Sequence, residues 1–211
     1  PVLVRRKPGA PMASIALYVV GGAVEEEPGN AGLTLLTSRA MLKGTSTRTA
    51  AQIAEAAEML GGSISASSGS DSFGWSFSVP TPRLAEALEL LGDVIQRPTI
   101  PDDAFETERS VAISNVAMLR DDMYRYPMRL ATSVALAKHP YGIPPIGTEE
   151  SLRAITPQQA REWHKDHVLS SAAVIGVVAD ADVKEVADLV ARAFGALDLK
   201  KAPKIAKPRW P

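Results

Sequence analysis

The sequence of 211 residues contains no cysteine, which excludes disulfides, thiol nucleophiles and thiolate metal sites. Aromatic residues make up only 5% of the chain, too few for a surface on which nucleic-acid bases stack. The net charge of −1 likewise indicates neither nucleic acid nor an anionic membrane as the main partner. The longest apolar run, AAVIGVVA at 172–179, suits a buried strand and is far shorter than the roughly 20 residues of a membrane-spanning helix.

Motifs of several enzyme classes are also missing. The chain has no GxSxG nucleophile turn, no GxxxxGK[ST] phosphate loop and no GxGxxG fingerprint. Carboxylate pairs such as Asp102 and Asp103 stand at expected helix starts, where the helix dipole explains them. His164 and His167 are spaced i, i+3, so they could bind a metal weakly from one helix face. Partly exposed helix histidines beside a tryptophan are the simpler interpretation, and His139 is expected to have a structural role at a helix end.

Alternating and helical patterns together predict the fold class. Alternation or apolar runs predict strands at 2–6, 13–22, 63–80 (a hairpin) and 172–178. Helical spacing, caps and terminators predict helices at 30–42 with Asn30 as N-cap, 47–62 with Thr49 as N-cap, 81–98, 101–122, 128–140, 156–168 and 180–194. The expected fold is therefore α+β, a two-layer sandwich whose largely antiparallel sheet carries helices on one face.

The ends of the sequence predict the domain organisation. Residues 1–200 are expected to form one domain, followed at 201–211 by a Lys/Pro-rich linker. The chain does not begin with Met and shows no signal-peptide pattern. We therefore expect one domain of a longer polypeptide, with a second domain of the same kind after the linker.

The stretch GNAGLTLLTSRAMLKGT, residues 29–45, carries a resemblance to a known family. It resembles the zinc-motif segment of the pitrilysin family, which includes insulinases and mitochondrial processing peptidases. In that family the pattern is G-L-A-H-x-x-E-H-x-x-x-K-G-T, in which both His bind Zn²⁺ and the Glu activates the bound water. Gly32, Leu33, Lys43, Gly44 and Thr45 match its frame.

The resemblance implies that four functional positions have been replaced. Counting back from Gly44, the two His positions hold Leu35 and Arg39, and the Glu position holds Ser38. The third ligand, a Glu in an E-R-x-V-x-x-x-E helix, is replaced by Asn115 in ERSVAISN. Leucine cannot coordinate a metal, serine is a poor general base, arginine repels Zn²⁺ and asparagine is a weak neutral ligand. We therefore expect no catalytic residue and no bound metal in this chain.

Two further segments extend the resemblance over nearly the whole chain. HPYGIPPIGTEESLRAIT, residues 139–156, is similar to the family's H-P-Y-G-x-P-x-x-G-T-E-E-S-L-x-x-I-T segment. The strand after L-G-G is, in the family, the edge strand that pairs with an extended substrate. Its counterpart here is a candidate peptide-binding edge strand made of Ser63, Ile64, Ser65, Ala66 and Ser67.

Three hypotheses about function follow. The first is a non-catalytic domain or subunit of a pitrilysin-type zinc metallopeptidase, which encloses an unfolded peptide together with an active partner that holds the zinc. The second is a structural scaffold that reuses the peptidase fold without proteolysis. The third is an active peptidase with an unconventional site around His164 and His167. The sequence leaves the compartment open, and the resemblance to exported, cysteine-poor relatives favours the bacterial periplasm or cell envelope.

Overall fold

Five strands form a single sheet in the computed structural model, which describes residues 1–195 and 197. The strands are β1 Val2–Arg6, β2 Met12–Val20, β3 Ile64–Ser68, β4 Ser72–Pro80 and β5 Ala173–Ala179. Their order in the sheet is β1-β5-β2-β4-β3, and only the β1–β5 pair is parallel. The prediction of a largely antiparallel sheet is confirmed, whereas the predicted linker at 201–211 lies outside the described residues.

The two faces of the sheet have different side chains. Along β2, Ile15, Leu17 and Val19 are buried, and the residues between them are exposed or half-buried. Strand β4 continues the pattern with buried Phe73 and Phe77. Because successive side chains of a strand point to opposite faces, this alternation gives the sheet one apolar face that helices can cover.

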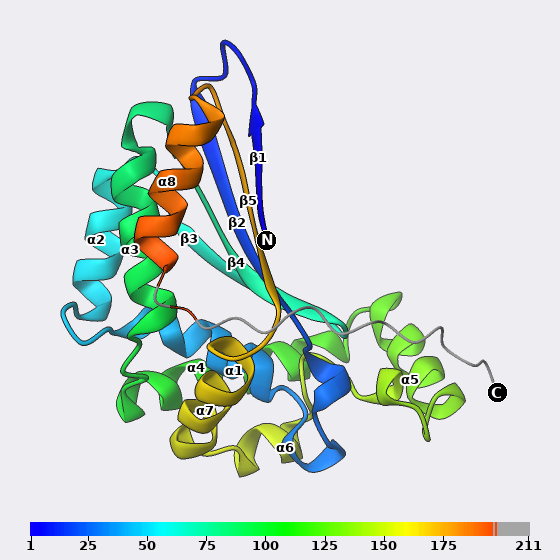
Figure 1. The fold of residues 1–211 in the computed structure, drawn as a ribbon. Helices are drawn as coiled ribbons and strands as arrows, with labels where there is room; N and C mark the ends of the chain where they lie inside the picture. The colour runs from blue at the N-terminus through cyan, green and yellow to red at the C-terminus, as the bar shows by residue number, and fades with distance from the viewer. Residues whose placement is uncertain (196, 198–211) are drawn as a thin grey trace.

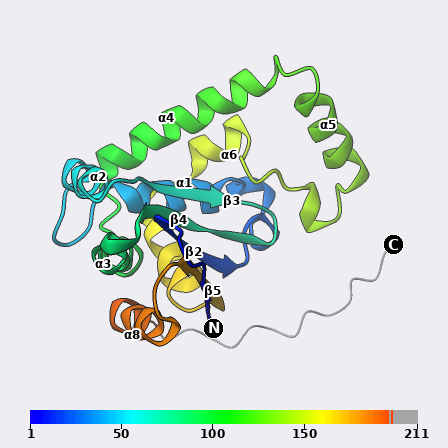
Figure 2. The ribbon, with the colours of Figure 1, turned by 90° about the horizontal axis from the view of Figure 1, so that it is seen from above.

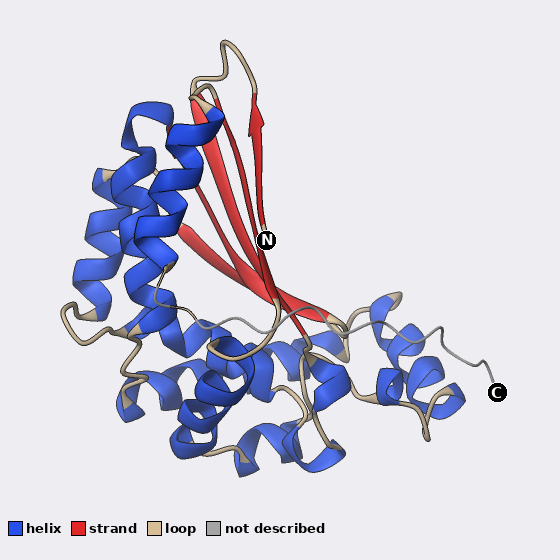
Figure 3. Cartoon of the chain, in the orientation of Figure 1, coloured by secondary structure: helices blue, strands red, loops and turns tan. Residues whose placement is uncertain are grey.

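Helices cover that apolar face in one layer (Figures 1 and 3). They are α2 Ala50–Met59, α3 Leu84–Gln96 and α8 Val183–Phe194. Along this part of the sheet, no described helix lies on the opposite face. The predicted two-layer α+β sandwich is therefore confirmed.

The remaining helices gather at one end of the sheet (Figure 1). They are α1 Leu33–Ala40, α4 Asp102–Leu119, α5 Arg125–Ala135, α6 Glu149–Ala154 and α7 Pro157–Trp163. Seen from above, α4 runs along the β3 side of the sheet, and α5 lies beyond the C-terminal end of α4 (Figure 2). Helix α5 has no buried residue. No helix in the described part of the chain is long and apolar enough to cross a membrane.

One large side chain joins the sheet to α1. Trp75 on β4 is 1% exposed, and its Nε1 donates a 3.0 Å hydrogen bond to the carbonyl oxygen of Ser38. Burial of side chains of this size contributes about 1.5–3 kcal/mol each. The same core holds Phe73, Phe77, Leu36 and Met41, so α1 is packed directly onto the sheet.

The helix boundaries agree with the predictions in part. Thr49 caps α2 as predicted and forms a capping box with Gln52. The predicted helix at 156–168 ends its α-helical part at Trp163 and continues as a π-helical turn, His164–Val168. Helix α6 was not predicted, because its six residues are too few to display a helical period.

Candidate functional site

Helix α1 carries three of the four zinc-motif positions, and its start differs from the prediction. The N-cap is Gly32, not Asn30, and Gly32 has a left-handed φ of 93°. Asn30 instead ends a short 3₁₀ turn, where its side-chain oxygen accepts a 2.6 Å hydrogen bond from the Glu27 amide. The prediction was wrong because the chain must reverse tightly at 32, a conformation that glycine adopts without steric cost.

Glu26 supplies the cap that Gly32 cannot. Its two carboxylate oxygens accept 2.7 Å hydrogen bonds from the amides of Gly32 and Thr34. The side chain is buried, and loss of hydration raises the pKa of the Glu26 carboxyl above its ordinary value despite these hydrogen bonds. Sequence reasoning missed this residue. The sequence feature that could have indicated it is the glycine at the start of the helix. Glycine has no side chain to accept hydrogen bonds from the first amides of the helix, so another residue must accept them.

Three of the four replaced positions line one pocket of about 340 Å³ between α1 and α4. Leu35 and Arg39 reach it from α1, and Asn115 reaches it from α4, 76 positions after Arg39 in the sequence (115 − 39). The residues were predicted as a set from the family resemblance, and the fold brings these three together. The pocket is completed by Ala112, Met118, Leu119, Arg125 and Ile146.

Ser38 does not line this pocket. It is 1% exposed, and its Oγ donates a 2.7 Å hydrogen bond to the carbonyl of Thr34, one turn earlier in α1. Its own carbonyl accepts the hydrogen bond from Trp75. A serine that is bonded back to its own helix has a structural role and presents no group to the pocket.

The residues around the pocket do not fit a zinc ion. Leu35 offers no ligand atom, Arg39 brings a permanent positive charge, and Asn115 offers only a neutral amide. Among the described residues, no group of three or more His, Asp or Glu side chains is arranged to hold a metal. Two guanidinium groups beside an amide suit an anion better than a cation.

The exit from α1 keeps the residues of the family frame, and each has a structural contact. Lys43 Nζ lies 3.0 Å from a carboxylate oxygen of Glu108 on α4. A Cβ atom at Gly44 would lie 2.8 Å from Thr99 Oγ1, so a larger residue would displace the 99–101 loop. Thr45 Oγ1 donates a 2.9 Å hydrogen bond to Asp93. These contacts explain why a helix without zinc ligands has the same exit.

Asp93 on α3 is the centre of a buried polar cluster. Its side chain is 1% exposed and accepts hydrogen bonds from Thr45, Thr47, Arg48 and Arg97. Burial alone would raise the pKa of Asp93, but the hydrogen bonds from Arg97, the two threonines and Arg48 outweigh it and lower the pKa. The carboxylate therefore remains charged and ties the loop after α1 to α3.

The 139–156 segment holds the start of α1 from the other side. Gly147 lies against Gly32 so closely that a Cβ atom at Gly32 would stand 3.0 Å from Gly147 Cα. Ser151 Oγ donates a 2.8 Å hydrogen bond to the Ala31 carbonyl, and Thr148 caps α6. The segment that resembles the family most specifically is thus the one that positions the zinc-motif helix.

The candidate peptide-binding strand lies at an edge of the sheet, as predicted. Strand β3 pairs only with β4, and the described chain places no other strand beside it. It begins at Ile64, so Ser63 stands just before it. Ser65 and Ser67 are exposed, whereas Ile64 and Ala66 are half-buried against the core.

The three histidines have separate partners. His164 is buried, and its Nε2 lies 2.8 Å from the Ile95 carbonyl. His167 stacks on Trp163, and its Nδ1 lies 2.8 Å from a carboxylate oxygen of Glu25. The Nδ1 of His139 accepts from the Tyr141 amide. The π-helical turn therefore directs His164 and His167 to different partners, and these contacts favour structural roles over a shared metal.

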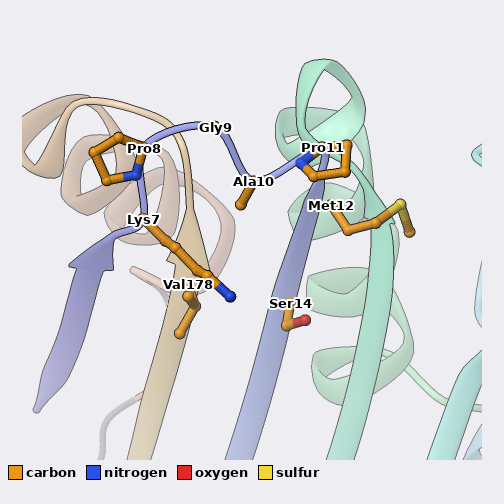
Figure 4. Close-up of a pocket in the computed structure, with 8 residues that line it drawn as sticks. All are labelled: Lys7, Pro8, Gly9, Ala10, Pro11, Met12, Ser14 and Val178. Atoms are coloured by element: carbon orange, nitrogen blue, oxygen red, sulfur yellow. The ribbon is translucent and has the colours of Figure 1, made fainter.

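Another hollow, of about 370 Å³, lies at the β1–β2 turn, which is at the end of the sheet away from α1 (Figure 1); Figure 4 shows its lining residues. It is lined by the β1–β2 turn from Lys7 to Met12, together with Ser14 and Val178. Of the described residues that line it, Lys7 alone is charged. This hollow contains neither a nucleophile paired with a base nor a cluster of acceptors, so it adds no chemistry to the α1–α4 pocket.

The largely antiparallel sheet backed by helices, with the short helix α1 beside the long helix α4, is the arrangement of a pitrilysin-like peptidase domain. The chain belongs to the insulinase family, peptidase family M16, whose model matches residues 1–149. A further model, described as the Peptidase M16 inactive domain, matches residues 154–210.

Curated relatives are about twice as long as this chain. An uncharacterized zinc protease of Mycobacterium leprae is 30% identical over 194 residues, which cover 92% of this chain and 44% of the relative. An uncharacterized zinc protease of Bacillus subtilis is 24% identical over 213 residues, which cover 99% of this chain and 51% of the relative. The chain thus spans about half the length of the curated relatives it matches.

Solved structures share the fold. A protease from Helicobacter pylori superposes with a TM-score of 0.84 at 20% identity, covering 99% of this chain and 50% of that one. A peptidase M16 inactive domain from Pseudomonas fluorescens superposes with a TM-score of 0.84 at 24% identity, covering 100% of this chain and 51% of that one. Pitrilysin superposes with a TM-score of 0.81 at 25% identity, covering 98% of this chain and 23% of that one.

Proposed function

We propose that this chain is the catalytically silent half of an M16 peptidase, acting beside a partner that holds the zinc and cuts the peptide. The observation that carries the proposal is the α1–α4 pocket, which Leu35, Arg39 and Asn115 line together. The family resemblance assigns to these three residues the positions of the family's zinc ligands. The chain's length, about half that of its curated relatives, supports a role as one half of a larger assembly.

The electrostatics of the pocket support the absence of zinc. A guanidinium at Arg39 remains charged at every physiological pH and repels a divalent cation. Ser38 is the replacement for the water-activating Glu, and its hydroxyl is already bonded to Thr34. In the proposed assembly, zinc and the water that it activates belong to the partner alone.

The contribution of this chain is then to help enclose an unfolded peptide. With no further described strand beside it, β3 has one edge whose backbone groups an extended peptide can pair with by strand addition. Ser63, Ser65 and Ser67 are small, so they leave that edge accessible. Backbone pairing needs no particular peptide side chain and suits a chamber that accepts unfolded substrates.

Metal analysis and mixing test the proposal. We expect the purified chain to hold no stoichiometric zinc after incubation with Zn²⁺ and desalting, whereas a relative with an intact H-x-x-E-H motif holds zinc under the same treatment. Hydrolysis of an unfolded peptide should rise when that relative is mixed with this chain. One tightly held zinc per chain would contradict the proposal. Mixing that gave neither a gain in hydrolysis nor a complex would favour the scaffold function instead.

A matched variant controls the mixing experiment. Replacement of the zinc-activating Glu in the partner by Gln should abolish hydrolysis in the mixture, because this chain supplies no base of its own. The Ser38→Ala variant of this chain should leave hydrolysis by the mixture unchanged. Activity that survives in the partner's Glu→Gln variant would place the chemistry in this chain and would sink the proposal.

A further inference from the structure

We propose that the α1–α4 pocket binds a carboxylate of the enclosed peptide, so that the former metal site selects acidic peptides. The inference rests on the proposed function, because the enclosed peptide is the ligand that reaches the pocket. It goes beyond that function by giving the pocket a ligand of its own.

The Arg39 guanidinium is the group that would hold the carboxylate. Arg39 is half-buried and lines the pocket of about 340 Å³. Within the described part of the chain, its side chain makes no ion pair and no hydrogen bond, whereas Lys43, one turn later, is paired with Glu108. A guanidinium that is partly desolvated and lacks a counter-ion attracts a carboxylate strongly, because two parallel N–H donors match its two oxygens.

The other lining residues favour the same ligand. Asn115 adds an amide that can donate to a carboxylate, and Arg125 adds a second positive charge, part of which is compensated by its ion pair with Asp122. Among the residues that the structure describes, no acidic side chain lines the pocket. The remaining walls are apolar and include Leu35 and Ile146, which suit the methylene groups of an acidic side chain.

The pocket is within reach of a peptide on the edge strand. Helix α1, which carries Leu35 and Arg39, packs against β3. A neighbouring hollow of about 350 Å³ shares Leu119, Arg125 and Ile146 with the pocket and extends to Ser70, in the turn that follows β3. The two hollows therefore adjoin each other, and together they reach from α1 to the turn after β3. A peptide paired with β3 would thus run beside these hollows and could place a side chain in them.

The test measures binding of fluorescein-labelled peptides to the full chain by polarization at low salt. Three extended peptides differ in one feature each: a central Glu with a blocked C-terminus, a central Gln with a blocked C-terminus, and a central Gln with a free C-terminal carboxylate. We expect the Glu peptide to bind about tenfold tighter than the blocked Gln peptide. The difference should shrink at high salt, because exposed parts of the ion pair are screened.

Variants connect the selectivity to Arg39. Arg39→Gln should abolish the difference between the Glu and Gln peptides while leaving the affinity for the Gln peptide unchanged. Arg39→Lys should retain part of the difference, since it keeps the charge and loses the planar fork. Arg192→Gln, at an exposed position on α8, is the matched control and should behave as the native chain. Thermal melts of all variants establish that they are folded.

Each outcome decides the inference. A gain for the free C-terminus alone would identify the chain terminus, in place of a side chain, as the source of the carboxylate. Equal affinities for all three peptides, no binding of any of them, or selectivity that survives in Arg39→Gln would overturn the inference. The peptide-binding experiment involves neither zinc nor hydrolysis. A negative binding result therefore does not change the conclusions from the zinc and mixing experiments. Negative results in those experiments likewise do not change the conclusion about peptide binding.

Discussion

Thr45 Oγ1 donates a 2.9 Å hydrogen bond to Asp93 Oδ2, and this contact joins the end of the zinc-motif-like segment to a carboxylate buried in α3. Thr45 is the last residue of the frame that the chain shares with its family. Thr45 has a structural role that involves no metal, because without Thr45 and its neighbours the buried charge of Asp93 would lack partners.

Asp93→Asn should therefore destabilise the chain by about 2 to 3 kcal/mol, since it removes the charge to which two arginines and two threonines donate. Urea denaturation at pH 7 measures the effect. Asp188→Asn, at an exposed position on α8, is the control and should change the free energy of unfolding by less than about 0.5 kcal/mol. Equal stability of the two variants would contradict the role assigned to Asp93.

The contribution of Asp93 should also depend on pH. Its pKa is lowered in the folded chain, so the stabilisation is fully present above the unfolded pKa of about 3.9 and is lost as the pH falls through the folded value. The difference in unfolding free energy between the native chain and Asp93→Asn should be constant from pH 7 to about pH 5. It should decrease below pH 4, which denaturation curves at each pH measure.

Glu26→Ala should destabilise the chain by about 2 kcal/mol, because it leaves the buried amides of Gly32 and Thr34 without an acceptor. Hydrogen exchange should locate the change in the first turn of α1. Glu58→Ala on α2 is the control, since Glu58 is exposed. A loss of stability of the same size in both variants would mean that Glu26 does not cap the helix.

His164 should make the stability pH-dependent near neutrality. Burial lowers the pKa of His164, because loss of hydration outweighs the hydrogen bond to the Ile95 carbonyl. The unfolded chain then binds a proton more readily than the folded chain, so stability should fall as the pH drops through the unfolded pKa of about 6.5. His164→Gln should remove this part of the pH dependence. An unchanged profile between pH 7.5 and 5.5 in the variant would contradict the prediction.

Lys43 and Glu108 should show a small coupling energy. The Lys43 side chain is 38% exposed and that of Glu108 is 12% exposed, so solvent screens part of their attraction. A double-mutant cycle with Lys43→Met and Glu108→Gln should give about 0.5–1 kcal/mol at low salt and less at high salt. A coupling of zero would show that the pair does not help to hold α1 against α4.

The sequence was sufficient to predict the strands and helix caps that depend on local patterns of residues. The alternation along β2 and β4, and the cap at Thr49, could be recognised because their causes lie within a few neighbouring residues. The N-cap of α1 could not, because its acceptor, Glu26, lies in a different turn and its glycine is fixed by contact with Gly147. Asp93 was missed for a similar reason: it has helical spacing with Leu90 and Arg97, and only the fold shows that partners surround it.

The sequence and the family resemblance predicted which residues form the candidate site, but not how they are arranged. Leu35 and Arg39 lie one turn apart, but nothing local links them to Asn115, and the family resemblance supplied that link. The resemblance could not show that Ser38 turns away from the pocket toward Thr34. It also could not show that Arg125 and Ile146 complete the pocket, since these residues lie outside the motif.

The exposed methionines near helix α5, which has no buried residue, can report whether a partner covers this part of the chain. Met118, Met123 and Met128 lie around the corner between α4 and α5 and are 62%, 76% and 68% exposed, whereas Met41 is fully buried. A peroxide pulse should therefore convert these three thioethers to sulfoxides early, together with Met59 on α2, which is 77% exposed, and Met41 last. Any molecule that covers this corner would slow their oxidation, so mass spectrometry of the sulfoxides could reveal a bound partner before that partner has been identified.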